Sequence, residues 1–469
     1  MVRVMNWNIE QLSINKLAVP GMLTAIAEII VTARADIVLL LEVRLTQVES
    51  AMRQLSGALN GRDPGPTHMN WTGYFLSRQT GGEYYAALVR NLDYIRPVVV
   101  STGPDGSRLH PLCDLRENTF AVWPTANWAA TAYPVAAARP SIPLCDVFAT
   151  PRFDRPAKRR RTAFAGKPLA EGGFATGRGY RLPALAMFWV RTAVPGGHLL
   201  PFVICHYAAV RGHGQRNTLA QAQVAQLPHL HIAQLFNSNP AGPGTSGYLD
   251  VLDDARNHRA VRVQELCFTG DFNIDFLHNS AAGDHLARVN RAAIAALTPT
   301  AERGGSAAPP AAPGVAGPVP PVPYAPPQPP AREIGTIGNQ VLRAAVTEQG
   351  TIQREYPLPV PPPPPPYASA AFDNFFYGGT CLVSAAQHPH DAGEVINVPV
   401  RITQAHPAPP GQINLAATAG YYVIQLHKKN ADNAPGLRLG APPLTDNERL
   451  IGARLISDHL PVVLEFNCP

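Results

Sequence analysis

The feature that most constrains the fold of this chain is a set of short apolar runs that each begin or end at a polar residue. In the clearest example, residues 266–269 lead into Gly270, and Asp271 and Asn273 follow. Short apolar runs are typical of strands in a buried sheet, and glycine marks the turn where the backbone leaves the sheet. On a continuing strand, Asp271 and Asn273 would share one face. Other runs begin or end at Asn8, Glu42, Glu83, His206, Asp373 and Asp458–His459.

The start of the chain alternates between strand and helix patterns. Residues 2–9 and 36–43 have the pattern of strands, and apolar residues at helical spacing from 23 to 30 predict a helix between them. We expect Asn8 and Glu42, at matching ends of the two strands, to lie at one rim of a sheet. Glu42 closes five consecutive apolar residues, a position that charged side chains rarely occupy without a partner or a metal.

Further strand patterns follow, separated by irregular stretches. Residues 84–90 and 94–100 predict a hairpin around residues 91–93. A polar segment, Ser457 to His459, leads into a final strand at the end of the chain. The remaining predicted elements are strands at 181–190, 199–205 and 370–377 and a helix over roughly 216–236.

Proline and glycine indicate two insertions in this pattern. The chain of 469 residues contains 49 prolines and 38 glycines, which is well above average usage. Residues 101–178 form a basic, loop-rich insertion with a cationic run at 152–161, which suits a solvated loop or a contact with a phosphate backbone. Residues 279–366 form a proline-rich insertion that suits protein partners. We expect a single domain over residues 1–469 with both insertions within it.

Composition excludes few classes of protein. The sequence has no signal-peptide pattern, no apolar run long enough for a membrane span and no CxxC pair among its six cysteines. We therefore expect a cytoplasmic protein and leave export by a dedicated secretion system open. A net charge of +6 fits an anionic partner and also fits plain solubility.

The polar residues at the strand ends suggest a particular chemistry. Carboxylates together with amides suit a hard divalent cation such as Mg²⁺, which prefers oxygen ligands. Two histidines, His206 and His459, each have candidate carboxylate partners and suit general acid and base catalysis near neutral pH. A metal, a base and an acid together imply attack of an activated water on a phosphoester.

The order of these motifs resembles the endonuclease/exonuclease/phosphatase superfamily, and within it most resembles deoxyribonuclease I. The resemblance covers about half of the chain. It implies a four-layer α/β sandwich with two central mixed β-sheets. The motifs that carry it, in chain order, are NWNI, LLLEVR, GEYYAALVR, YRLPALAMF, ICHYA, GDFNID, FDNFFY and SDHLPV.

The resemblance also implies catalytic roles for individual residues. His206 resembles a catalytic histidine that Glu83 polarises, and His459 resembles a second one that is paired with Asp373. Asp271 and Asn273 resemble the pair that contacts phosphate, water and metal.

Metal and substrate contacts follow from the same resemblance. It implies a site for Mg²⁺, with Mn²⁺ or Ca²⁺ as alternatives, formed by Glu42, Asn8, Asp458 and Asp271. Arg44 resembles an arginine that enters the minor groove of DNA, and Arg181 resembles one that contacts phosphate, with Asn273 also on the substrate side.

The resemblance leaves the substrate open. The favoured interpretation is a metal-dependent endonuclease acting on double-stranded DNA. The alternatives are a phosphatase or phospholipase acting on phosphoinositide or sphingomyelin-type substrates, and a non-catalytic interaction scaffold. Gly81 stands where deoxyribonuclease I has a tyrosine, so one stacking contact to the duplex is missing or supplied elsewhere.

Overall fold

The computed structural model describes a core of strands and helices and the segments that join them. The described residues are 1–19, 21–44, 48–63, 71–78, 83–90, 94–97, 184–192, 198–207, 220, 248–252, 258–262, 265–277, 332–337, 340–354, 367–379, 382–383, 391–399, 402–403, 413–414 and 446–468.

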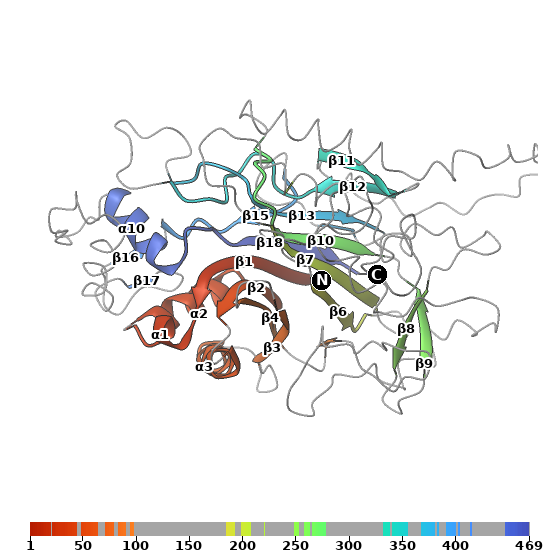
Figure 1. The fold of residues 1–469 in the computed structure, drawn as a ribbon, viewed down its shortest axis with the longest axis horizontal. Coiled ribbons are helices and arrows are strands. Elements are labelled where there is room, and N and C mark those ends of the chain that lie inside the picture. The colour runs from red at the N-terminus through yellow and green to blue at the C-terminus, as the bar shows by residue number, and fades with distance from the viewer. Residues whose placement is uncertain are drawn as a thin grey trace, which may run out of the picture.

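Within these residues, two mixed β-sheets form the centre of the molecule (Figure 1). In the first sheet, β1 pairs in parallel with β2 and antiparallel with β18. Its order is β14 (Leu382–Val383), β18 (Val462–Asn467), β1 (Val2–Leu12), β2 (Ile37–Arg44), β4 (Glu83–Arg90) and β3 (Trp71–Arg78), and β15 (Glu394–Val395) also pairs with β18.

The second sheet is also mixed, because β7 and β10 are parallel and their other neighbours are antiparallel. Its order is β11 (Arg332–Ile337), β12 (Gln340–Ala344), β13 (Asp373–Gly378), β10 (Leu266–Asp271), β7 (His198–His206), β6 (Ala184–Val190) and β5 (Ile95–Pro97). Two smaller ribbons pair β8 (Tyr248–Leu252) with β9 (His258–Arg262) and β16 (Ile402–Thr403) with β17 (Ile413–Asn414).

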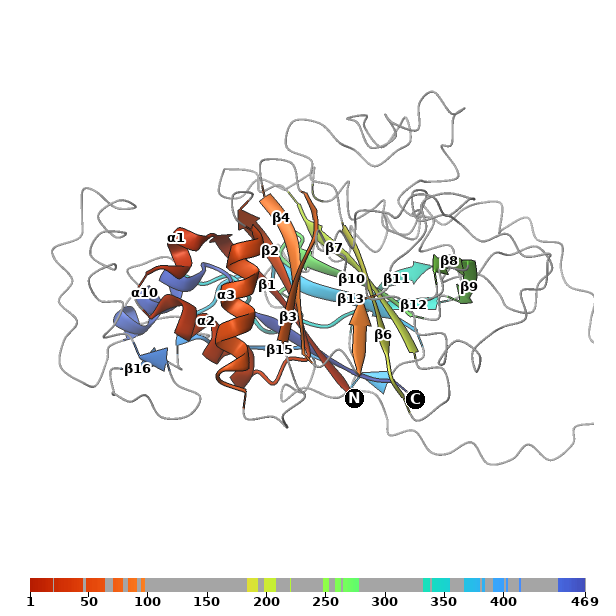
Figure 2. The ribbon, with the colours of Figure 1, turned by 90° about the horizontal axis from the view of Figure 1, so that it is seen from below.

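Helices cover the face of the first sheet that points away from the second (Figure 2). They are α1 (Ile14–Leu17), α2 (Met22–Thr32), α3 (Val48–Asn60) and α10 (Asp446–Ile456). The predicted helix at 216–236 lies almost wholly outside the described residues. None of the described helices is both long enough and apolar enough to cross a membrane.

Strand β1 shows how the sequence pattern builds these layers. Its side chains alternate, so that Val2 and Val4 pack between the two sheets while Met5 and Trp7 pack against the helices. Between the sheets, Phe202 of β7 and Phe466 of β18 meet edge to face, with ring centroids 5.6 Å apart. The fold is therefore an α/β sandwich with two central mixed β-sheets, which confirms the fold class predicted from the sequence.

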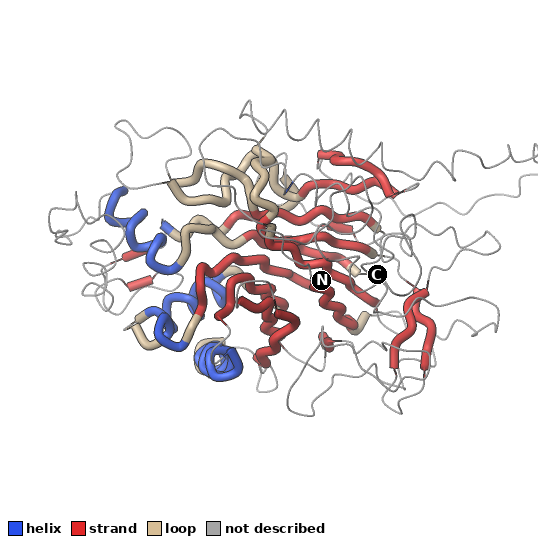
Figure 3. Tube along the Cα trace, in the orientation of Figure 1, coloured by secondary structure: helices blue, strands red, loops and turns tan. Residues whose placement is uncertain are grey.

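Two expectations about chain organisation are wrong. The predicted hairpin does not form, because β4 pairs with β2 and β3 in the first sheet whereas β5 pairs with β6 in the second. Part of the range 279–366 belongs to the core, since β12 pairs with β13 and the loop 345–354 that follows, drawn as loop in Figure 3, is largely buried. Residues 101–178 and the proline-rich segment 309–330 lie outside the described residues.

Candidate active site

The candidate site forms where strand ends of the two sheets face each other. Glu42 reaches it through an irregularity in β2. Strict alternation after Leu39 and Leu41, which face the second sheet, would turn Glu42 towards the helices. Instead, one extra residue lies between Leu40 and Val43 relative to β4, and Glu42 adopts a left-handed backbone with φ 59°. This β-bulge redirects the Glu42 side chain to the inter-sheet side.

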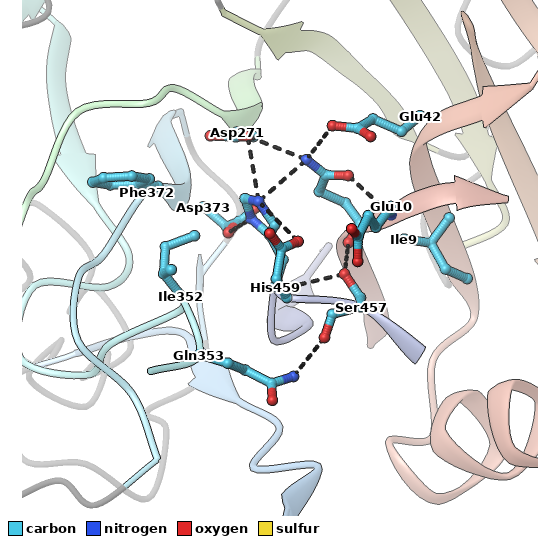
Figure 4. Close-up of polar contacts among 12 residues, drawn as sticks. Ile9, Glu10, Glu42, Asp271, Ile352, Gln353, Phe372, Asp373, Ser457 and His459 are labelled. Atoms are coloured by element: carbon cyan, nitrogen blue, oxygen red, sulfur yellow. Dashed lines mark hydrogen bonds and ion pairs between the residues drawn. The ribbon is translucent and has the colours of Figure 1, made fainter. Parts of the chain in front are cut away.

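Asn8 connects two carboxylates from different sheets, Glu42 and Asp271, both of which are labelled in Figure 4. Its Nδ2 atom donates to Glu42 Oε1 at 3.1 Å and to Asp271 Oδ2 at 3.2 Å. Its Oδ1 atom accepts the backbone N–H of Glu10 at 3.2 Å. The amide therefore serves here as a donor that holds two carboxylates together, while one of the two lone pairs on Oδ1 accepts the bond from Glu10.

His206 lies at the end of β7, against carboxylates from both sheets. Its Nε2 atom is 3.2 Å from Glu42 Oε1 and 3.7 Å from Asp271 Oδ2. One oxygen of Glu83, at the start of β4, lies within 4.8 Å of ligand atoms of both His206 and Glu42. The structure thus brings Glu83 close to His206, as the resemblance implies, and adds Glu42 to the group.

His459 forms a dyad with a fully buried carboxylate. Its Nδ1 atom is 2.7 Å from Asp373 Oδ2 in β13, and its Nε2 atom is 3.7 Å from Asp271 Oδ2. Burial lowers the pKa of His459, but the charges of Asp373, Asp271 and Asp458 outweigh burial and hold it well above the usual value. Burial raises the pKa of Asp373 to about 6, against the opposing effect of His459. The dyad therefore retains a proton near neutral pH.

The pKa of the Glu42 carboxylate is shifted in the opposite direction to that of Asp373. Burial alone would raise its pKa, but hydrogen bonds and charges from His206, Asn8 and His459 lower the pKa to about 2. Glu42 is consequently ionised throughout the neutral range, which is the state that a cation requires of its ligand.

Asp271 and Asn273 do not share a strand face, contrary to expectation. Strand β10 ends at Asp271, and Asn273 lies in a turn with φ 50°. The backbone N–H of Asn273 donates to Asp271 Oδ1 at 2.9 Å and its Nδ2 atom donates to the Tyr207 carbonyl at 2.7 Å. Gly270 allows the close approach of β7 and β10 here, because a Cβ atom would lie 1.7 Å from the Cys205 carbonyl oxygen.

Three supporting residues of the site were missed from the sequence. Thr351 Oγ1 accepts the backbone N–H groups of Phe372 at 3.0 Å and Asp373 at 2.9 Å, which fixes the start of β13. Ser457 donates to the Asn8 carbonyl at 2.7 Å and accepts the His459 N–H at 3.0 Å. Gln353 Nε2 donates to the Ser457 carbonyl at 2.8 Å. Ser457 was visible beside the Asp458–His459 pair, whereas Thr351 and Gln353 lie in the range expected to be an insertion.

The other residues predicted for the site lie at its rim, at the end of β2 or outside the described residues. The Asp458 side chain is 36% exposed, with Oδ1 3.7 Å from His459 Nε2, so it sits at the rim rather than between the sheets. Arg44 ends β2, opposite Glu83 in register, and is partly buried. Arg181 lies outside the described residues.

The donor set fits a divalent cation. Two groups, Glu42–Glu83–His206 and Asp271–Asp373–His459, each bring three ligand atoms within 4.8 Å of one another. Asn8 joins the groups by bonding both Glu42 and Asp271. Carboxylate oxygens are the ligands that Mg²⁺ and Mn²⁺ prefer. Of these residues, Glu42 and Asp271 are the best placed to hold such an ion.

A two-sheet α/β sandwich with buried histidine–carboxylate pairs at one rim is consistent with the deoxyribonuclease I-like fold. The chain matches the Endonuclease/Exonuclease/phosphatase family model over residues 5–459 and belongs to that family. Members of this family hydrolyse phosphoester bonds and generally depend on divalent metals. No curated protein matches the chain in sequence.

Solved structures similar to this chain have low sequence identity to it. Truncated TDP2 from Caenorhabditis elegans is 11% identical with a TM-score of 0.37, over 99% of this chain and 97% of that one. A mannosyl-6-phosphatase from Bacteroides thetaiotaomicron is 12% identical with a TM-score of 0.39, over 99% of both chains. TDP2 from D. rerio, in complex with a single-strand DNA product, is 8% identical with a TM-score of 0.34, over 99% of this chain and 98% of that one.

Proposed function

We propose that the chain is a divalent-metal-dependent phosphodiesterase that cleaves nucleic acid, with double-stranded DNA as its substrate. The observation that carries the proposal is that two imidazoles approach one carboxylate oxygen. The Nε2 atoms of His206 and His459 each lie 3.7 Å from Asp271 Oδ2. A phosphodiester at this point would have one histidine near the attacking water and the other near the leaving oxygen.

The surroundings of the histidines assign their roles. His459 is the proton donor, because Asp373 holds its Nδ1 atom and raises its pKa, leaving Nε2 directed into the site. His206 accepts the proton of the attacking water, and Glu42, 3.2 Å away, stabilises the imidazolium that results. The water oxygen bonds to phosphorus, and the leaving 3′-oxygen takes the proton from His459. The products are a 3′-hydroxyl and a 5′-phosphate.

The cation and the substrate contacts complete this proposal. Glu42 and Asp271 would hold the cation, which supplies positive charge to the phosphoryl oxygens and lowers the pKa of water. Asn8 holds these two carboxylates close together by donating a hydrogen bond to each. Three features favour nucleic acid as the substrate: the net charge of +6, the basic run at 152–161, and Arg44, which lies opposite Glu83 in register.

The test is a substrate panel for the purified full chain. Supercoiled plasmid, RNA, a phosphoinositide and sphingomyelin would each be incubated with Mg²⁺ and with EDTA, beside a His459→Ala control. We expect plasmid nicking with Mg²⁺ and none with EDTA or with the variant. Undiminished nicking in EDTA would overturn the metal dependence. Phosphate or headgroup release from a lipid, without nucleic acid cleavage, would overturn the substrate.

A further inference from the structure

A second buried asparagine lies one step deeper between the sheets than Asn8. Asn6 is fully buried, and neither its Nδ2 nor its Oδ1 atom has a hydrogen-bond partner among the described residues. A buried amide without partners is costly, so native proteins satisfy such groups with protein atoms or with internal water.

The strand pattern defines the surroundings of Asn6. It continues the face of β1 that carries Val4 and Asn8, which points towards the second sheet. Its partners in register are Leu39 of β2 and Val462 of β18, and both belong to the apolar core between the sheets. Neither of these neighbours offers a side-chain hydrogen bond to the carboxamide.

A second unsatisfied atom lies on the facing sheet. Asp373 Oδ2 binds His459, but Asp373 Oδ1 is buried and has no partner among the described residues. Asp373 pairs in register with Asp271, the residue that Asn8 contacts across the sandwich. Strand β1 packs against both β10 and β13, so Asn6 and Asp373 border the same inter-sheet space.

We propose that Asn6 and Asp373 Oδ1 hold internal water between them, which makes Asn6 a positioning residue for the histidine dyad. Such water accepts from Asn6 Nδ2 and donates to Asp373 Oδ1, and internal waters typically make two to four hydrogen bonds of this kind. The link fixes the plane of the Asp373 carboxylate, so that Oδ2 stays aligned with His459 Nδ1. The effect on turnover rests on the proposed function, whereas the water and the dyad geometry do not.

The direct test is a high-resolution crystal structure of the full chain together with NMR of the His459 imidazole in metal-free protein. We expect ordered water within hydrogen-bond distance of Asn6 and of Asp373 Oδ1. We also expect Asn6→Leu to shift the His459 ring resonances, and Asn6→Ser, which keeps a polar group and room for water, to shift them less. A protein partner for Asn6, or a dry space between the two residues, overturns the proposal.

Kinetics provide the second test, with a matched control. Asn6→Leu should lower kcat by about 10-fold with KM unchanged, as is usual when a residue that orients a catalytic histidine is lost. Val462→Ala, which disturbs the same apolar layer without a polar group, should leave kcat within about threefold. Equal losses in the two variants, or unchanged kcat and His459 resonances in Asn6→Leu, overturn the proposal. If wild type cleaves no DNA, the proposed function fails while the crystal and NMR tests still decide this inference.

Discussion

The two histidines of the site differ in how their partners are distributed. His206 presents the same atom, Nε2, to Glu42 and to Asp271. His459 divides its two nitrogens, with Nδ1 on Asp373 and Nε2 towards Asp271. The Asp373 side chain is fully buried, while that of Glu42 is 16% exposed and also bonds Asn8.

This difference in surroundings gives Glu42 and Asp373 opposite pKa shifts. Glu42 has several donors around it and a pKa of about 2, so it stays charged and accessible to a cation. Asp373 is enclosed with a pKa raised to about 6, so it shares a proton with His459. Burial and neighbouring donors therefore set the sign of each pKa shift, downward for Glu42 and upward for Asp373.

The largest expected effect comes from removing either histidine. His206→Ala and His459→Ala should each slow single-turnover cleavage of a labelled duplex by roughly 10²–10⁴-fold. The double variant should lose less than the product of both effects, because the residues act as one unit. His198→Ala is the matched control, since His198 is buried at the other end of β7 beside Glu265. A single site variant within about threefold of wild type would show that its histidine is structural.

Glu42→Gln tests the metal side of the comparison. It should weaken Mg²⁺ binding by about 10–100-fold, measured by calorimetric titration, while Asp373→Asn should leave binding much less affected. Glu394→Gln is the control, because Glu394 pairs with Arg3 away from the site. Equal Mg²⁺ affinity in wild type and Glu42→Gln would refute the assignment of Glu42 as a ligand.

Glu42 and His459 should respond to pH with opposite sign, because the pKa of Glu42 is lowered and that of His459 is raised. Glu42 has its pKa lowered from 4.5 to about 2, so its contribution to stability is present above pH 4.5 and is lost as the pH falls through about 2. The pKa of His459 is raised, so its contribution is present below pH 6.5 and is lost as the pH rises through the folded-state value.

Urea unfolding of metal-free protein over this pH range measures both contributions. The difference in free energy of unfolding between wild type and Glu42→Gln should close in acid. The difference between wild type and Asp373→Asn should close in alkali. If both differences close in the same direction, the electrostatic contrast between the two groups is wrong.

Thr351 should show a smaller effect that is confined to the dyad. Thr351→Val leaves two backbone N–H groups at the start of β13 without their acceptor, and should cost about 1–3 kcal/mol of stability. The substitution should also lower kcat several-fold, because Asp373, which orients His459, loses the bond that fixes its backbone. Thr347→Val, which removes a bond to Asp391 in the same loop, should lower stability without this loss of turnover. Equal turnover in the two variants would argue against a positioning role for Thr351.

The smallest effect is expected from the proline-rich segment 309–330. Such sequences contribute little to a packed core, so a short Gly/Ser linker in its place should leave turnover within a few-fold of wild type. Loss of activity comparable to that of His459→Ala would show that the segment belongs to the site.

The sequence by itself determined the strands and the family. Apolar runs at 2–9, 36–43, 199–205 and 266–269 predicted β1, β2, β7 and β10, because the side chains of a buried strand must be apolar on both faces. The polar residues that end these runs stood out for the same reason, since a charge beside a core needs a partner. Their order along the chain was enough to indicate the family that the chain matches.

Tertiary structure alone decided which side chains meet. Periodicity reports burial but not the partner strand, so β4 and β5 were predicted as one hairpin although they belong to different sheets. Glu42 faces Asn8 only because a β-bulge, in which Glu42 has φ 59°, reverses the alternation of side chains along β2. The position of such a bulge depends on hydrogen bonds to neighbouring strands. Thr351 supports Asp373 from a loop between proline-rich stretches, where local sequence carries no signal of a contact 22 residues away.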